Sequence, residues 1–216
     1  MGYTTNFSGQ INIGGTLTLH QFQYLRKFSD SRRMQRDAKK TAKLEDHFRK
    51  AVGLLTVGDE GGYYVGDSER GPDILNHNQP PKGQPGLWCQ WTVNDEGNAL
   101  VWNEAEKFYE YIDWLKYLIA HFYKPWGYNL NGVITWEGED RSDVGTIEVV
   151  DNVVKVTQGI VGIASEGSVD GGFDKLMMDI TSEAQRMWEK AGGEMLTMDE
   201  MNDLRDAITE IFAEKQ

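Results

Sequence analysis

The feature of this sequence that most constrains its fold is a pair of alternating apolar and polar segments that meet at Asp151-Asn152. Asp and Asn tolerate a left-handed backbone, so a two-residue turn here would fold the two segments into a β-hairpin. The turn sets the register, and that register matches apolar residues on one face with threonines and opposite charges on the other. The sequence therefore predicts an antiparallel hairpin with these pairs: Val149 with Val154, Ile147 with Val156, Glu148 with Lys155, and Thr146 with Thr157.

Four more segments alternate with a period of two, and we predict that they are strands. In the second of them the odd-numbered residues from 87 to 93, which include Cys89 and Trp91, are all apolar. We expect this apolar face to be the core face of a strand at the centre of the sheet, with Trp88 on the opposite face. The four segments are residues 3–13, 87–93, 99–102 and 128–136.

Two helices between the strands are predicted from their start and stop signals. Thr18 and Gln21 have the spacing of a capping box, which predicts a helix that runs to about residue 29. Asn103 and Glu106 repeat the pattern and predict a second helix, which Pro125 would end. The apolar stripe of the second helix consists of Phe108, Tyr111, Ile112, Leu115, Leu118, Ile119 and Phe122.

The order of these elements predicts the fold class and the domain boundaries. The order is strand, helix, two strands, helix and three strands. It predicts that residues 1–157 form an α+β fold, in which an antiparallel sheet has helices packed on one face. Residues 158–216 follow as a predicted linker and a C-terminal helical hairpin, whose two helices are separated by Gly192-Gly193. The apolar stripe of this extension needs a cover, which is either the main domain or a second copy that forms a homo-oligomer through residues 173–214.

Composition limits the classes of partner. The net charge is −12, but residues 1–56 carry ten Lys and Arg against four Asp and Glu, and the other 160 residues carry twelve against thirty. The overall negative charge disfavours unspecific binding of nucleic acid, while a local basic segment could hold a phosphate or an acidic partner. The single cysteine, Cys89, excludes an internal disulfide, and no run approaches the ~20 apolar residues of a membrane span. We expect a soluble, cytoplasmic protein that makes no membrane contact.

Several stretches resemble one uncharacterised family of small proteins found in phage, prophage and bacterial genomes. The resemblance covers about residues 2–157, and it implies a phage or prophage setting in a bacterial host cell but no catalytic residue. It ends before the extension. The matching stretches are Gly2-Tyr3-Thr4-Thr5, Arg32-Arg33-Met34 with Arg36, Pro80-Pro81, Gly83-Gln84-Pro85-Gly86-Leu87-Trp88-Cys89-Gln90-Trp91, Trp102, Glu106-Lys107-Phe108-Tyr109, Asn131-Gly132, Gly138-Glu139-Asp140 and Asp151-Asn152.

The best candidate for a binding site is the basic segment of residues 26–50, whose composition favours helix with a break near Ser29. At helical spacing, positions 32, 36, 39 and 43 would share one face, which could track phosphates or meet an acidic partner. The alternative is internal compensation, in which the basic side chains lie against the protein's own acidic surface. The candidate residues are Arg32, Arg33, Arg36, Lys39, Lys40 and Lys43.

A second candidate is an aromatic contact surface. Trp114, Tyr117 and His121 lie off the core stripe of their helix, and Trp88 lies off the core face of its strand. These side chains could meet a partner, although the C-terminal hairpin could instead pack over those of the helix. His77 lies in the 53–86 loop between two asparagines, the one histidine whose context could suit catalysis.

No other pattern indicates catalysis, a metal or a cofactor. The acidic group Glu137, Glu139, Asp140 and Asp143 fits a solvated hairpin turn better than a cation site, because its spacing matches no calcium loop. The histidines have no ligand-type spacing, and nucleotide-binding and nucleophile motifs are missing from the sequence. We therefore expect no catalytic residue, no metal ligand and no cofactor.

Three functional hypotheses remain. The first is a non-enzymatic phage or prophage accessory protein that binds a host or viral macromolecule, as an inhibitor of a host defence would. The second is a protein that binds, or acts on, a nucleotide or small phosphorylated ligand through the basic segment and the 53–86 loop. The third is a virion or assembly component. The last sixty residues carry thirteen Asp and Glu against five Lys and Arg, which suits either imitation of DNA or an ordinary acidic surface.

Overall fold

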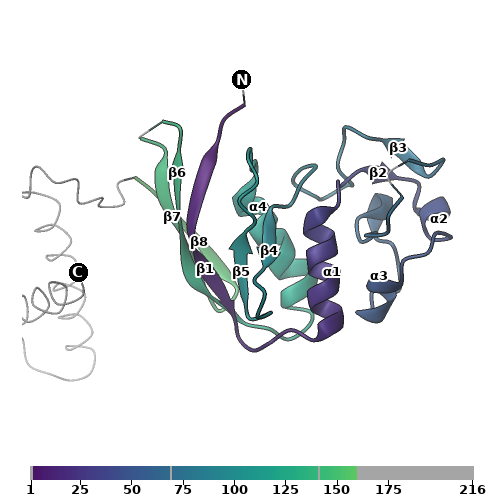
Figure 1. Cartoon of the computed structure of the whole chain (residues 1–216), viewed down its shortest axis with the longest axis horizontal. Coiled ribbons are helices and arrows are strands. Elements are labelled where there is room, and N and C mark those ends of the chain that lie inside the picture. Colours follow the sequence, from purple (N-terminus) through teal and green to yellow (C-terminus); the bar gives the residue numbers. More distant parts are fainter. Residues whose placement is uncertain (1, 69, 141, 160–216) are drawn as a thin grey trace, which may run out of the picture. The chain divides into compact units, whose positions relative to one another are not determined.

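A six-stranded antiparallel sheet in the order β4-β5-β1-β6-β7-β8 organises the fold (Figure 1). The structure, a computed structural model, describes residues 2–68, 70–140 and 142–159. These belong to one of two units of the chain, Met1–Val161, while the other, Gly162–Gln216, lies outside the described residues. The strands of the sheet are β1 (Thr5–Ile13), β4 (Trp91–Val93), β5 (Ala99–Trp102), β6 (Leu130–Gly138), β7 (Val144–Val150) and β8 (Val153–Gln158).

The centre of the sheet is the pairing of β1 with β6. These two nine-residue strands pair along their whole length, from Thr5 opposite Gly138 to Ile13 opposite Leu130. Alternation in β1 buries Thr5, Phe7, Ile11 and Ile13, while Gly9 on the same face is exposed. On the same face Trp136 of β6 lies so close to Gly145 of β7 that a Cβ at position 145 would be 2.1 Å from Cη2 of the indole.

The β7–β8 hairpin has the predicted register. Val149 pairs with Val154 and Glu148 with Lys155, and the other two predicted pairs are also present. Asp151 and Asn152 both have positive φ, 48° and 67°, which is the backbone of the two-residue turn that suits the twist of a hairpin. The prediction is confirmed because every cross-strand pair on both faces favours the same register.

The strand at residues 87–93 is shorter than predicted and lies at the sheet edge instead of the centre. Only Trp91–Val93 pair, with β5. The carbonyl of Leu87 instead accepts a 2.8 Å hydrogen bond from the backbone N–H of Arg33, which ties this part of the chain to the segment after the first helix. Cys89 and Trp91 are buried and Trp88 is exposed, as predicted, but Gln90, on the predicted outer face, is also buried.

The two predicted helices form, but the second begins later than its sequence signal. α1 (Leu19–Asp30) starts at the predicted capping box, and Thr18 accepts from the N–H of Gln21. α4 is Tyr111–Leu118 and continues as a π-helical turn, η2 (Ile119–Tyr123). Asn103 does not cap it, because the amide of Asn103 donates to the Gln90 carbonyl and the chain continues beside β4.

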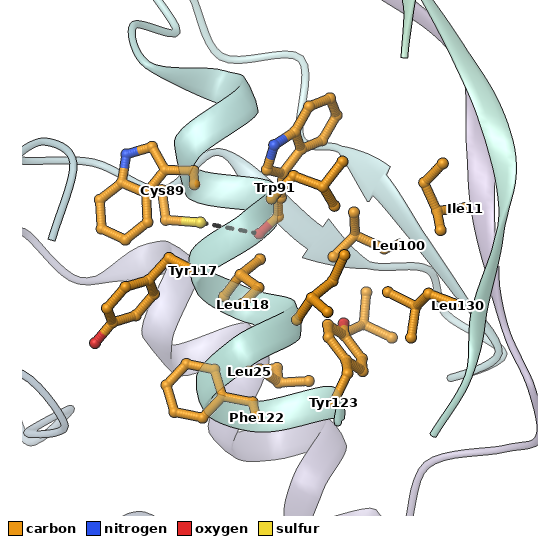
Figure 2. Packing of buried hydrophobic residues seen from close by; sticks show 14 of the residues in the cluster. Ile11, Leu25, Cys89, Trp91, Leu100, Tyr117, Leu118, Phe122, Tyr123 and Leu130 are labelled. Atoms are coloured by element: carbon orange, nitrogen blue, oxygen red, sulfur yellow. Dashed lines mark hydrogen bonds between the residues drawn. The ribbon is translucent and has the colours of Figure 1, made fainter. Parts of the chain in front are cut away.

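The core lies between the sheet, α4 and α1. In Figure 1 the described helices lie on one side of the β1–β6–β7–β8 part of the sheet, so the α+β architecture agrees with the prediction. α4 is buried on more than one side, because α1 covers part of the surface that the sheet does not. Figure 2 shows the resulting cluster, in which Ile11, Leu100 and Leu130 of the sheet meet Leu118 of α4, Phe122 of η2 and Leu25 of α1.

The predicted helix over residues 26–50 is replaced after Asp30 by several short elements. Asp37 and Asp46 each cap a new helix with their carboxylates, so the chain restarts twice within a few residues. Residues 63–65 form no strand, although Tyr64 and Val65 are buried. The elements are β2 (Gln35–Arg36), α2 (Ala38–Thr41), α3 (His47–Ala51), the 3-10 turn η1 (Asp59–Gly61) and β3 (Ile74–Asn76), with β2 and β3 paired as a second, two-stranded sheet.

The predicted C-terminal helical hairpin and the contact through residues 173–214 lie outside the described residues. Among the helices of residues 2–159 that the structure describes, none has the length and apolar character that crossing a membrane requires.

Candidate binding surface

Arg36, predicted to bind a ligand, is part of the protein's interior. Its Nη1 lies 2.6 Å from the Asp73 carboxylate, and both side chains are almost completely buried. Its Nη2 donates to the Ser68 carbonyl, and its Cζ lies 4.7 Å from the centre of the Tyr64 ring. Asp73 also lies within 3.4 Å of the Thr41 hydroxyl. Arg36 therefore holds the loop of residues 53–86 against the short elements that follow α1.

Arg33 is also buried, with 2% of its surface exposed. Its Nε donates to Oε1 of Gln84 at 3.2 Å, and its Nη2 donates to the Gly62 carbonyl at 2.7 Å. The guanidinium lies 4.1 Å from the centre of the Phe28 ring. These acceptors are neutral, and burial lowers the pKa of Arg33. Like Arg36, this residue organises the loop and does not face a ligand.

The predicted row of basic side chains along one helix face does not exist. Arg36 lies in β2, while Lys39 begins its own short helix after the cap at Asp37. Lys39, Lys40 and Lys43 are exposed, and Lys40 reaches back to donate to the Pro72 carbonyl at 3.0 Å. The single-face prediction is wrong because it assumed one continuous helix. Internal compensation, the alternative, is realised at Arg36 by its ion pair.

Arg32 and Trp88 come from different predicted groups, and the structure brings them together. The Nε of Arg32 donates to the His77 carbonyl at 3.1 Å, and its Nη2 donates to Oδ1 of Asn78 at 3.3 Å. These bonds hold the guanidinium over the indole of Trp88, with Cζ 5.9 Å from the ring centre. Trp88 is 42% exposed, so one aromatic surface and one cation are presented together to solvent.

These two residues line a hollow of about 250 Å³. Nδ1 of His77 lies 3.1 Å from the sulfur of Met34, so the hollow is built where β2 begins and β3 ends. Within the described part of the chain, no carboxylate forms an ion pair with Arg32 or Arg70. We call this set the Arg32–Trp88 surface, and its residues are Arg32, Met34, Arg70, His77 and Trp88.

Arg32, His77 and Trp88 are candidates from the sequence alone, whereas Met34 and Arg70 are not. Met34 occurs only within the resembling stretch Arg32-Arg33-Met34, and Arg70 belongs to no motif. The β2–β3 pairing, which places the two segments side by side, has no strong sequence signal. The charge of Arg70 is a signal in the sequence that could have indicated a binding residue. Arg70 is a cation in a loop that is otherwise rich in acidic and small residues, and the structure shows that it is exposed.

The predicted aromatic surface on the second helix is wrong for two of its residues. Trp114 is fully buried, and Tyr117 is 8% exposed. Their rings pack against Phe28 of α1, with centroid distances of 6.1 and 6.2 Å. The main domain itself supplies the cover. α4 is buried on more than one side, and its apolar stripe marks only one of them.

His121, on the same helical segment, is exposed but lines a different hollow. Its ring lies on that of Tyr117 with a centroid distance of 4.2 Å, and its Nδ1 is 3.0 Å from the Tyr63 hydroxyl. Partial burial lowers the pKa of His121. The hollow, which also contains Asp59 and Lys82, has a volume of about 420 Å³.

The acidic group at the β6–β7 connection makes internal hydrogen bonds. Asp143 accepts from the Tyr3 hydroxyl at 2.7 Å and from the Trp136 indole at 3.1 Å, while Glu139 accepts from the Thr4 amide at 2.8 Å. These contacts attach the first residues of the chain to the β6–β7 turn. Among the residues that the structure describes, no three His, Cys, Asp or Glu side chains are grouped so that they could hold a metal ion.

Comparison of the chain with protein-family models, with curated proteins and with solved structures finds no match.

Proposed function

We propose that this protein acts by binding: it is a phage or prophage accessory protein that holds a host or viral protein through the Arg32–Trp88 surface, in the cytoplasm of a bacterial host. The observation that supports this most directly is the fixed position of the Arg32 guanidinium beside an exposed indole, with no described carboxylate paired to it. Tryptophan and arginine are the residues most enriched among the energetic centres of protein interfaces.

The geometry supports a partner that carries an anionic group. Nε and one N–H of Nη2 already donate hydrogen bonds to the loop. The remaining N–H groups of the guanidinium can bind a carboxylate or phosphoryl oxygen. The exposed face of Trp88 suits an apolar or planar group directly beside that anion. An acidic side chain flanked by an apolar one on the partner meets both requirements.

The phage setting and the role against a host defence rest on the resemblance of residues 2–157 to phage and prophage proteins. An accessory protein that neutralises a defence component needs a recognition surface and no catalytic group of its own. The Arg32–Trp88 surface can supply such recognition.

A nucleotide or other small phosphorylated ligand is the second candidate, and the hollow itself favours it. Its volume of about 250 Å³ is bounded by an indole and two guanidiniums. A base stacked on Trp88 would gain about 1–3 kcal/mol, and a phosphate would lie against the arginines. A role in virion assembly depends on residues 173–214 and remains a third proposal.

Capture of partners from infected-host lysate by four forms of the full-length protein tests the leading proposal. The forms are wild type, Trp88→Ala, Arg32→Gln and a matched control, Arg26→Gln, which removes an arginine already paired with Asp95. We expect one partner to be retained by wild type and control and lost by the two surface variants. A partner held equally by all four would contradict the assignment of the surface.

Thermal unfolding with a nucleotide panel tests the second candidate. A ligand at 100 times its Kd stabilises the folded state by about 2.7 kcal/mol, which corresponds to a Tm increase of roughly 5–11 °C for a chain of this size. The increase should disappear in Trp88→Ala and persist in Arg26→Gln. A nucleotide that stabilises Trp88→Ala as strongly as wild type would place the ligand elsewhere.

A further inference from the structure

We infer that the cleft at Tyr63, Tyr117 and His121 is a second ligand site, built to hold the carbonyl oxygen and adjacent N–H of a small neutral amide or imide. Its lining also includes Asp59, Lys82 and Thr56, and its volume is about 420 Å³. It shares no lining residue with the Arg32–Trp88 surface, so the inference stands apart from the proposed function.

The buried Arg33 determines which way the proton of Tyr117 points. A guanidinium can only donate, so the Gln84 amide must turn its oxygen to Nε of Arg33 and its nitrogen away from it. That nitrogen donates to the Gly62 carbonyl at 2.6 Å and to the Tyr117 hydroxyl at 3.0 Å. The Tyr117 oxygen is therefore an acceptor in this contact, and its own proton remains for the cleft. Tyr117 is 8% exposed, so this free donor belongs to a largely desolvated side chain.

Tyr63 and His121 add a second free donor whichever tautomer the imidazole adopts. Burial lowers the pKa of His121, so at neutral pH the ring carries one proton. If the Tyr63 hydroxyl donates to Nδ1 across their 3.0 Å contact, that proton is on Nε2 and faces away from Tyr63. If Nδ1 carries the proton and donates to Tyr63, the phenolic proton is left over instead. Two donors therefore remain on these three side chains in both cases.

Two neutral donors call for an acceptor oxygen, and the charges of the cleft select a neutral one. Lys82 and Asp59 line the same cleft with opposite charges, so a phosphate would gain one attraction and meet one repulsion. Asp59 is also an acceptor and can take the N–H next to the carbonyl. A cleft lined by both neutral donors and an acceptor suits the edge of a cyclic amide or imide, such as a pyrimidine base.

The two elements that build this cleft both depart from regular geometry. His121 lies in the π-helical turn η2, a form that occurs mostly as single turns and frequently at functional sites. Asp59 opens η1, in which Glu60 has a φ of 48°, a left-handed conformation for a residue with a side chain. Such departures are stabilised by surrounding contacts, and the Glu60 carboxylate accepts the Lys82 amide at 2.8 Å.

Titration of the full-length protein with uracil, monitored through the His121 ring signals by NMR, tests the inference. We expect the His121 signals of the wild-type protein to shift and to saturate. Tyr117→Phe removes one donor but keeps the ring, so it should bind uracil at least roughly threefold more weakly. Tyr109→Phe changes an exposed tyrosine outside the cleft and should bind uracil as wild type does. Tyr63→Phe provides a second variant if Tyr117→Phe does not fold. The inference would be overturned if uracil did not move the His121 signals at any concentration up to its solubility limit. Equal uracil binding by all variants, or tighter binding of inorganic phosphate than of uracil, would overturn it as well.

Discussion

Replacement of Arg36 by methionine should destabilise the protein severely, even though Arg36 belongs to a segment that the sequence marked as a binding surface. Methionine keeps most of the length of the side chain but removes the cation 2.6 Å from Asp73. The Asp73 carboxylate would then be buried without its counter-ion, with only the Thr41 hydroxyl 3.4 Å away. One of its oxygens, Oδ1, already has no hydrogen-bond partner among the described residues.

The size of the effect follows from this burial. Both side chains are almost fully buried, at 6% and 2% exposed, and removal of one member of such a pair costs about 3–5 kcal/mol. Asp73→Asn should also destabilise, because it leaves the guanidinium with only neutral partners. The double variant should cost about 1–3 kcal/mol less than the sum of the two single changes, since neither charge is then left alone.

Urea unfolding of the full-length chain measures these costs. With a slope of about 2 kcal/mol per molar urea, Arg36→Met should lower the midpoint by about 1.5–2.5 M. Lys39→Met is the matched control, because Lys39 is exposed in the same segment and its replacement should change stability by less than about 0.5 kcal/mol. If Arg36→Met and Lys39→Met unfold at the same urea concentration, the assignment of Arg36 to the interior is refuted.

Three further predictions concern the sheet and its core. Gly145→Ala should cost about 1–3 kcal/mol, because its Cβ would be 2.1 Å from the Trp136 ring and 2.5 Å from the Thr157 carbonyl oxygen. A Tm equal to that of wild type would show that both the ring and the β8 backbone can move aside. Asp151→Gly should preserve the stability measured in urea or raise it by up to about 1 kcal/mol, because φ of Asp151 is 48°. Asn152→Gly should lower stability by about 1–2 kcal/mol, because it removes side-chain hydrogen bonds to the chain that enters β6. Equal effects of the two substitutions would contradict this. Burial raises the pKa of Cys89 to about 12, so its thiol stays protonated at pH 8. The thiol should therefore react with a disulfide reagent only as urea unfolds the chain. Rapid reaction in the native state would contradict this prediction.

The parts of the fold that could be predicted from the sequence are those fixed by residues near one another. The Asp151-Asn152 turn and its cross-strand pairs lie within fourteen residues, and the Thr18–Gln21 capping box within four. The position of residues 91–93 at the sheet edge could not be read in this way. It depends on the pairing of β1 with β6, and nothing within the strand itself specifies its neighbours.

The candidate site shows the same division. Arg32 and Trp88 could each be singled out by charge or exposure, but they are 56 positions apart in the sequence. They meet because the neighbouring Arg33 N–H donates to the Leu87 carbonyl, a contact that no local pattern predicts. Arg36 looked the same as Arg32 in the sequence, since both are cations in a basic segment. The two arginines differ in their partners. Arg36 is buried as the ion-pair partner of Asp73, which lies 37 residues further along the chain.

The pairing of β1 with β6 has a consequence for the newborn chain. β1 ends at Ile13, but its long partner is complete only at Gly138, so the first strand leaves the ribosome well before the strand that will cover it. At about 5–20 residues per second, the intervening 125 residues take roughly 6–25 s to synthesise. Throughout that interval the edge of β1 that pairs with β6 is open to other chains. The first partner of β1 to emerge is β5, which pairs with Ile11 and Asn12, so this short contact is the earliest protection that β1 can receive.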